Sequence, residues 1–137
     1  MRSHPITDKA SLSGVRRRIR SELTGLGVEP SALFDCLVAV TEACTNALLH
    51  GVDDEGPVPQ ISWNIDGTEA RFFVQDFAGQ EWSMAAHPSS GLSHLSPQQA
   101  EERVGGYGLN IMRGLMDEVD IDVTQKGTVV SLVKRFP

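Results

Sequence analysis

Apolar residues in the first part of the chain recur every three or four positions, which is the spacing of one face of an α-helix. Gly25 and Gly27 follow the last of these positions, and glycine commonly ends a helix. We therefore predict a first helix over residues 9–25. Its predicted buried face consists of Leu12, Val15, Ile19 and Leu23.

A second helical pattern follows after a short break. It opens at Pro30 and Ser31, with Ser31 as the expected N-cap, and it runs to about His50, where Gly51 is a natural stop. Its length and period predict a helix that packs one stripe against the core. The predicted core stripe consists of Leu33, Leu37, Val40, Cys44 and Ala47.

Four later segments have the composition of β-strands, and two short turn sequences join them in pairs. Asp66–Gly67 is a hairpin signal between the first two segments, and a Lys126–Gly127 turn joins the last two. We therefore expect two hairpins. The predicted strands span residues 59–66, 69–76, 119–124 and 128–135.

The region between the two hairpins differs from the rest of the chain. Residues 77–104 are rich in proline, serine and glycine, and a loop of this length is typically a functional lid or disordered. GGYGLNIMRGLMDEV (105–119) then predicts a glycine-rich turn that enters a helix. The order of elements predicts a single α+β domain over residues 1–137, a two-layer sandwich in which helices cover one face of a mixed, mostly antiparallel sheet.

Charge narrows the classes of partner. The chain has 137 residues and a formal net charge of −6, so it lacks the overall basic footprint that binding to nucleic acid requires. Its arginines are nevertheless crowded near the start, either as a solvated helix face or as a patch that docks an acidic partner. These arginines are Arg16, Arg17, Arg18 and Arg20.

The cysteines and the hydropathy of the chain indicate the cellular compartment in which the protein works. Cys36 and Cys44 match no metal-ligand spacing, and we expect them to be small buried residues in a reducing compartment. The first residues, MRSHPITDK, contain no apolar signal core, and we find no apolar run near 18 residues. We therefore expect a cytoplasmic protein with no membrane partner.

TEACTNALLHG (41–51) carries the first candidate chemistry. Glu42 and Asn46 are one helical turn apart, and we expect both to lie opposite the core stripe together with Asp35, Ala39 and Ala43. A solvent-exposed strip is one interpretation. The other is a nucleotide site, in which the amide oxygen of Asn46 binds Mg²⁺ and the Glu42 carboxylate orients or deprotonates a hydroxyl.

Three further motifs are each weak in isolation. Asp76 ends a predicted strand in FFVQDFAGQ, where a carboxylate can accept a hydrogen bond from an exocyclic amine. GGYGL (105–109) brings backbone N–H groups to the start of a helix, where phosphates bind well. KGTVVSLVKRF places Thr128 at the start of the last strand.

In this order and spacing, the motifs resemble the ATP-binding fold of the GHKL group, which includes gyrase-type and histidine-kinase ATPases. TEACTNALLHG, GYGLNIMRGLMDEV and GTVVSLVK look most like the anti-sigma-factor serine/threonine kinases of bacteria. The resemblance implies ATP and Mg²⁺, with Glu42 as the catalytic base and Asn46 as the metal ligand. It assigns nucleotide contacts to Asp76, Gly79, Arg103, Gly106, Gly108, Leu109 and Thr128.

The resemblance also implies partner switching. Such a protein blocks a sigma factor and phosphorylates an anti-anti-sigma antagonist on serine or threonine, commonly as a homodimer. One departure favours an alternative, because the family's glycines after the strand-end Asp are here Ala78 and Gln80. That alternative is a degenerate module that binds its partner without efficient phosphotransfer. A histidine-kinase catalytic half is a third reading, and the four histidines do not fit its pattern.

Overall fold

The computed structural model describes residues 2–50, 57–77, 106–124 and 127–137. Within these ranges the chain forms three helices and one five-stranded sheet. The α+β class predicted from the order of elements is thus confirmed. The elements are β1 (Ser3–Pro5), α1 (Lys9–Gly25), α2 (Pro30–His50), β2 (Gln60–Ile65), β3 (Glu69–Asp76), α5 (Gly106–Leu115), β4 (Glu118–Thr124) and β5 (Gly127–Arg135).

The strands follow the order β1-β2-β3-β5-β4, and all four pairings among them are antiparallel. We expected a mixed, mostly antiparallel sheet, whereas the described strands form antiparallel pairs throughout. β1 was not predicted, because a three-residue strand that includes proline carries no periodic signal. In the β3–β5 pairing, Asp76 lies opposite Thr128. This register joins two motifs that are far apart in the sequence.

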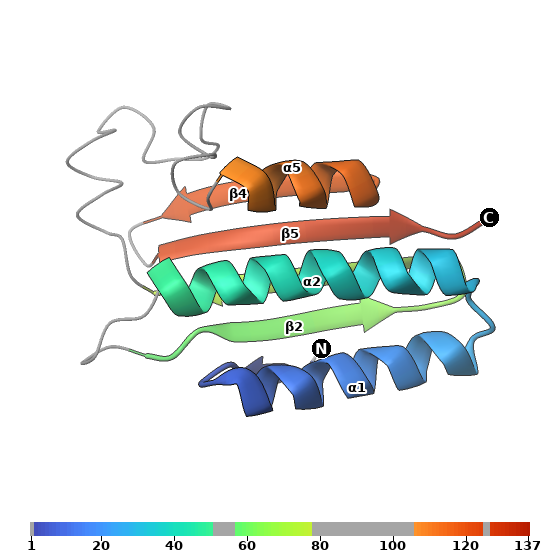
Figure 1. Cartoon of the computed structure of the whole chain (residues 1–137), viewed down its shortest axis with the longest axis horizontal. Coiled ribbons are helices and arrows are strands. Elements are labelled where there is room, and N and C mark those ends of the chain that lie inside the picture. Colours follow the sequence, from blue (N-terminus) through green and yellow to red (C-terminus); the bar gives the residue numbers. More distant parts are fainter. Residues whose placement is uncertain (1, 51–56, 78–105, 125–126) are drawn as a thin grey trace.

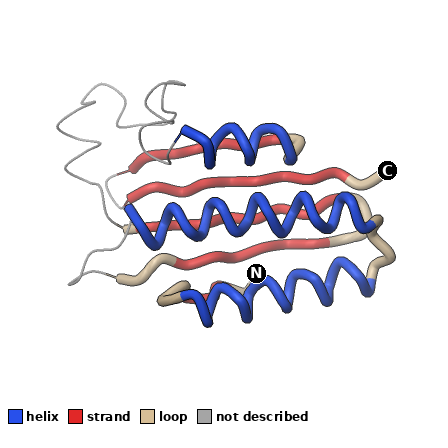
Figure 2. The backbone as a smooth tube through the Cα atoms, in the orientation of Figure 1, coloured by secondary structure: helices blue, strands red, loops and turns tan. Residues whose placement is uncertain are grey.

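The helices form a second layer over one face of the sheet, with α2 between α1 and α5 (Figure 1). The backbone trace in Figure 2 shows that the helices run nearly parallel to the strands beneath them. The core lies between the two layers. Its largest fully buried side chains include Phe72, Ile6, Ile19, Leu23, Ile61, Leu109, Met112 and Leu132.

α1 follows its sequence prediction closely. The side chain of Asp8 accepts a hydrogen bond from the backbone N–H of Ser11 at 2.8 Å, and the Ser11 hydroxyl oxygen accepts one from the N–H of Asp8. This reciprocal cap satisfies N–H groups that the first turn leaves free. Gly27 has φ +74° just after the helix and allows the chain to turn there. The predicted buried face, Leu12, Val15, Ile19 and Leu23, is confirmed.

α2 differs from its prediction in two ways. It begins at Pro30, so Ser31 lies inside the first turn and is not the N-cap. Ala39 and Ala43 are also buried, with exposed fractions of 0% and 2%, whereas we expected them opposite the core. The reason is that α2 has a helix on each side as well as the sheet beneath it, so it buries a wider arc than one stripe.

α2 is more apolar than we expected from the sequence, in which we found no apolar run near 18 residues. The segment Pro30–Leu49 has a mean hydropathy of 1.5, so by length and composition it qualifies as a candidate membrane span. In the structure this helix packs against α1, α5, β3 and β5. Helices in the centre of a protein core can have the same composition as membrane spans, and 39% of this segment is buried in the structure.

Candidate functional site

The first half of the site is formed where α2 approaches α5. A Cβ atom added at Gly108 would lie 2.8 Å from Nδ2 of Asn46 and 3.4 Å from Oε2 of Glu42. The backbone of α5 therefore lies directly against both side chains, and only glycine leaves room for them. Glu42 and Asn46 are both half-buried. They face Gly108 and are not a freely solvated strip.

Asn46 has an unsatisfied polar atom. Its Nδ2 is buried and has no hydrogen-bond partner among the described residues. A buried amide without a partner costs free energy, so such a group is typically completed by a ligand or water. Rotation of the amide about its terminal bond would turn the oxygen toward the same place. Asn46 therefore fits a role in holding a bound group, whether through its nitrogen or through its oxygen.

The second half of the site lies at the end of the sheet. Asp76 at the end of β3 and Thr128 at the start of β5 are the two buried polar residues there, with exposed fractions of 6% and 2%. Burial of a carboxylate requires hydrogen-bonding partners and is unusual without a functional or structural reason. A cavity of about 10 Å³ lies beside them, which is about the space of one water molecule. It is lined by Ala43, Asn46, Ala47, Val74, Asp76, Thr128 and Val130.

Asn46 connects the two halves, since it lies beside Gly108 and also lines this cavity. The small side chains of Ala43 and Ala47 leave the space between α2 and the sheet. A ligand the size of a purine would extend beyond the cavity. The polar groups that line this cavity are thus one carboxylate, one hydroxyl and one amide.

A backbone contact fixes the position of Asp76. Gly127 has φ +130°, a conformation that other residues rarely adopt. A Cβ atom there would lie only 2.0 Å from the backbone oxygen of Asp76. The strand ends that carry Asp76 and Thr128 can meet in this way because residue 127 is glycine.

The glycines of GGYGL are placed differently from the prediction. α5 begins at Gly106, so Gly106 and Gly108 lie in the first turn of the helix and not in a loop before it. The first turn of a helix has N–H groups without intrahelical partners, so these positions keep the predicted capacity for phosphate. Leu109 is fully buried in the core and anchors α5.

Several predicted residues lie outside the described residues. These include Gly79 and Arg103, the changed positions Ala78 and Gln80, and the predicted lid over 77–104 except for Phe77. Their assigned roles stay predictions. The structure thus brings together Glu42, Asn46, Gly108, Asp76 and Thr128, and it leaves the remaining assignments untested.

Sequence reasoning missed the contact of Gly108 with Asn46 and the role of Gly127. The signal for Gly108 was present, because glycine inside a helix is unfavourable and usually marks a close approach. For Gly127 the sequence shows only a turn residue. The collision with Asp76 depends on how β3 and β5 pair.

Comparisons with known proteins now define the class. Residues 7–134 match the histidine kinase-like ATPase domain. The chain therefore belongs to the family of histidine kinase-like ATPase domains. This confirms the resemblance proposed from the motifs.

Two relatives of known name indicate which branch of the family the chain belongs to. The chain is 33% identical over 125 residues to serine-protein kinase RsbW of Bacillus licheniformis, covering 85% of this chain and 75% of that protein. It is 30% identical over 103 residues to anti-sigma F factor of Thermoanaerobacter sp. strain X514, covering 74% and 69%. The chain is thus a member of the anti-sigma serine kinase branch of this family.

Two solved structures share the fold. The RsbU and RsbW domains of Rv1364c from Mycobacterium tuberculosis superpose with a TM-score of 0.68 at 19% identity, covering 99% of this chain and 33% of that longer chain. The SiaB–SiaC complex from Pseudomonas aeruginosa gives 0.60 at 14% identity, covering 96% and 86%. At these identities the likeness concerns the fold alone.

Proposed function

We propose that this protein is an anti-sigma factor with ATP- and Mg²⁺-dependent serine/threonine protein kinase activity toward an anti-anti-sigma antagonist. Family membership supports the kinase class. The observation that carries the proposal for this chain is the meeting of Glu42, Asn46 and Gly108. Asn46 also lines the cavity that is bounded by the buried pair Asp76 and Thr128. These are the groups that binding of a metal–nucleotide and activation of a hydroxyl require.

Each group has a distinct proposed task. Asp76 accepts a hydrogen bond from the exocyclic amine of adenine, and Thr128 lies beside the base. The N–H groups at the start of α5 bind phosphate oxygens. Asn46 would hold Mg²⁺ through its amide oxygen, and the ion would offset the negative charge of the phosphates.

Glu42 is the proposed general base. It takes the proton from the hydroxyl of the substrate serine or threonine while that oxygen forms a bond to the γ-phosphorus and the bond to the bridging oxygen of ADP breaks. Half-burial beside α5 restricts the orientation of the carboxylate and limits its access to water. Nucleotide contacts by Gly79 and Arg103 are part of the same proposal.

Two variants separate these tasks. Glu42→Gln should keep affinity for Mg-ADP and lose phosphotransfer, because it removes the base and leaves the shape. Asn46→Ala should weaken Mg-ADP binding itself. Binding is measured as Mg²⁺-dependent thermal stabilisation, and phosphotransfer as ³²P incorporation into the protein recovered with this chain from a cell extract. Equal loss of both functions in both variants would contradict the assignments.

One sequence observation favours the binding-only alternative. Ala78 and Gln80 replace glycines that the family usually has after the strand-end Asp. If saturating Mg-ATP produces no thermal shift while partner binding persists, the chain is a module that sequesters its partner without efficient phosphotransfer.

The biological setting belongs to the same proposal. The partners are a sigma factor and an anti-anti-sigma protein in the cytoplasm, with no direct role for nucleic acid or a membrane and with a homodimer as the expected assembly. A pull-down analysed by mass spectrometry, run with and without ATP, would identify both partners. Retention of one protein only with ATP and another only without it is the expected result for a partner switch.

A further inference from the structure

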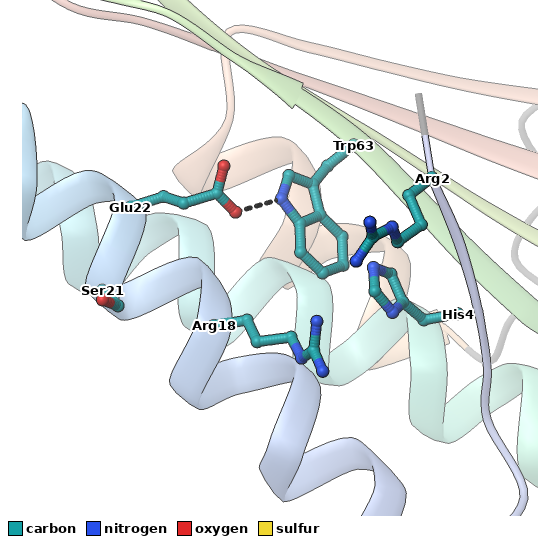
Figure 3. A pocket seen from close by; sticks show the side chains of 6 residues that line it. All are labelled: Arg2, His4, Arg18, Ser21, Glu22 and Trp63. Carbon is teal, nitrogen blue, oxygen red and sulfur yellow. Dashed lines mark hydrogen bonds between the residues drawn. The ribbon is translucent and has the colours of Figure 1, made fainter.

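A groove lies at the opposite side of the helical layer from α5, between α1 and the β1–β2 edge of the sheet. It has a volume of about 450 Å³, which is in the range of ligand-binding sites. None of the residues assigned to the nucleotide site lines it. Figure 3 shows the lining side chains, which are Arg2, His4, Arg18, Ser21, Glu22 and Trp63.

The aromatic wall of the groove is held in place by contacts on two sides. The rings of His4 and Trp63 stack with centroids 4.6 Å apart and an interplanar angle of 16°. The indole Nε1–H of Trp63 donates a hydrogen bond to Oε2 of Glu22 at 2.6 Å (Figure 3). Trp63 therefore joins β2 to α1. Among the described residues that line the groove, Glu22 is the one carboxylate, and it accepts this bond.

The two arginines are available to a ligand. Arg2 and Arg18 are exposed, and neither is in an ion pair with a carboxylate among the described residues. Arg2 extends from the segment just before β1, and Arg18 extends from α1 toward the same groove (Figure 3). Burial and the charges of Arg18 and Arg2 hold the pKa of His4 below its usual value of 6.5. The groove is thus a locally positive place on a chain of net charge −6.

We propose that this groove binds an acidic segment of a partner protein, with carboxylate side chains at Arg2 and Arg18 and an apolar side chain against Trp63. Guanidinium groups pair well with carboxylates, and an aromatic wall adds apolar contact next to them. A peptide fits better than nucleic acid, because the two arginines form only a small basic site, whereas a polyphosphate backbone requires an extended one.

The test uses the full chain without nucleotide, so it is independent of the proposed kinase activity. Trp63 fluorescence is followed in a Trp82→Phe background, since the chain has two tryptophans. The probe is a synthetic peptide with two adjacent glutamates between leucines, and its matched control has glutamines in their place. We expect saturable binding of the glutamate peptide that weakens with added salt, and much weaker binding of the control.

Variants locate the binding. Arg18→Gln should weaken the glutamate peptide about 3-fold, and Arg2→Gln combined with Arg18→Gln about 10-fold. Arg20→Gln is the matched control, because Arg20 is exposed on the same helix and does not line the groove. Three results would overturn the proposal. They are equal weakening by Arg20→Gln, equal binding of the glutamine peptide, and binding of an oligothymidylate in preference to the glutamate peptide.

Discussion

At Gly108 the absence of a side chain decides what lies against the two candidate catalytic groups. The nearest neighbours of the missing Cβ are the ends of Asn46 and Glu42, and both are side chains that can rotate. A methyl group at this position would therefore displace them without disturbing the backbone of either helix. Gly108 thus acts on the proposed chemistry through the orientation of Asn46 and Glu42.

Gly108→Ala should leave the fold intact and weaken Mg-ADP binding by about 10- to 100-fold, the range seen when a metal ligand loses its supporting contacts. The measurement is calorimetric titration, with thermal unfolding recorded alongside. Gly114→Ala on the same helix is the control, because nothing lies within 4 Å of its added Cβ. It should bind nucleotide normally and be up to about 1 kcal/mol more stable. Unchanged affinity in Gly108→Ala would remove the proposed role of this contact.

At the scale of elements, the end of β3 and the start of β5 form one unit. Asp76 and Thr128 are paired across these strands, and Gly127 allows the two backbones to approach at that point. β3 and β5 belong to different hairpins and are far apart in the sequence. Asp76 and Thr128 therefore meet only when both hairpins pair in the same sheet. The proposed adenine contacts depend on this β3–β5 corner.

Gly127→Ala should lower the free energy of unfolding by about 3 kcal/mol, because alanine disfavours φ +130° and its Cβ would collide with the backbone of Asp76. For a domain of this size the expected fall in Tm is roughly 10 °C. Gly67→Ala in the β2–β3 turn has open space around the added Cβ and should change Tm by no more than a few degrees. Similar Tm values for the two variants would show that the β3–β5 corner is not constrained as described.

At the scale of the whole molecule, α2 is the structural centre. Its apolar residues contact both neighbouring helices and the sheet, and both cysteines of the chain lie in it. Burial raises the pKa of Cys36 and of Cys44 to about 12. The thiols are therefore protonated and unreactive in the folded protein, in agreement with the expectation of small buried residues.

This burial predicts a dependence of stability on pH. Above pH 9.0, the ordinary value, unfolded thiols release protons while the folded ones retain them, so unfolding becomes easier as pH rises. Each thiol should lower the free energy of unfolding by about 1 kcal/mol per pH unit between pH 9 and 11. Denaturant titrations of the unmodified chain and of Cys44→Ala isolate the effect. The variant should show a shallower slope, and equal slopes would contradict the burial of Cys44.

Most of the secondary structure could be predicted because its signals are local. Leu12, Val15, Ile19 and Leu23 share a helix face by spacing alone, and Asp66 marks its turn through hydrogen bonds to residues two and three positions later. The burial of Ala39 and Ala43 could not be predicted, since it depends on where α1 and α5 dock. The groove beside Trp63 was missed because its residues come from three segments.

The sequence by itself determined the helices α1 and α2, the two hairpins and the family. Hydrophobic periodicity, turn residues and sequence motifs depend on positions that are close together in the chain. Only the tertiary structure decided which distant residues meet. Asp76 and Thr128 become a buried pair through the register of β3 and β5, and Glu42 and Asn46 meet Gly108 through the packing of α2 on α5. Contacts of this kind are set by packing and strand pairing across the chain, and no local pattern encodes them.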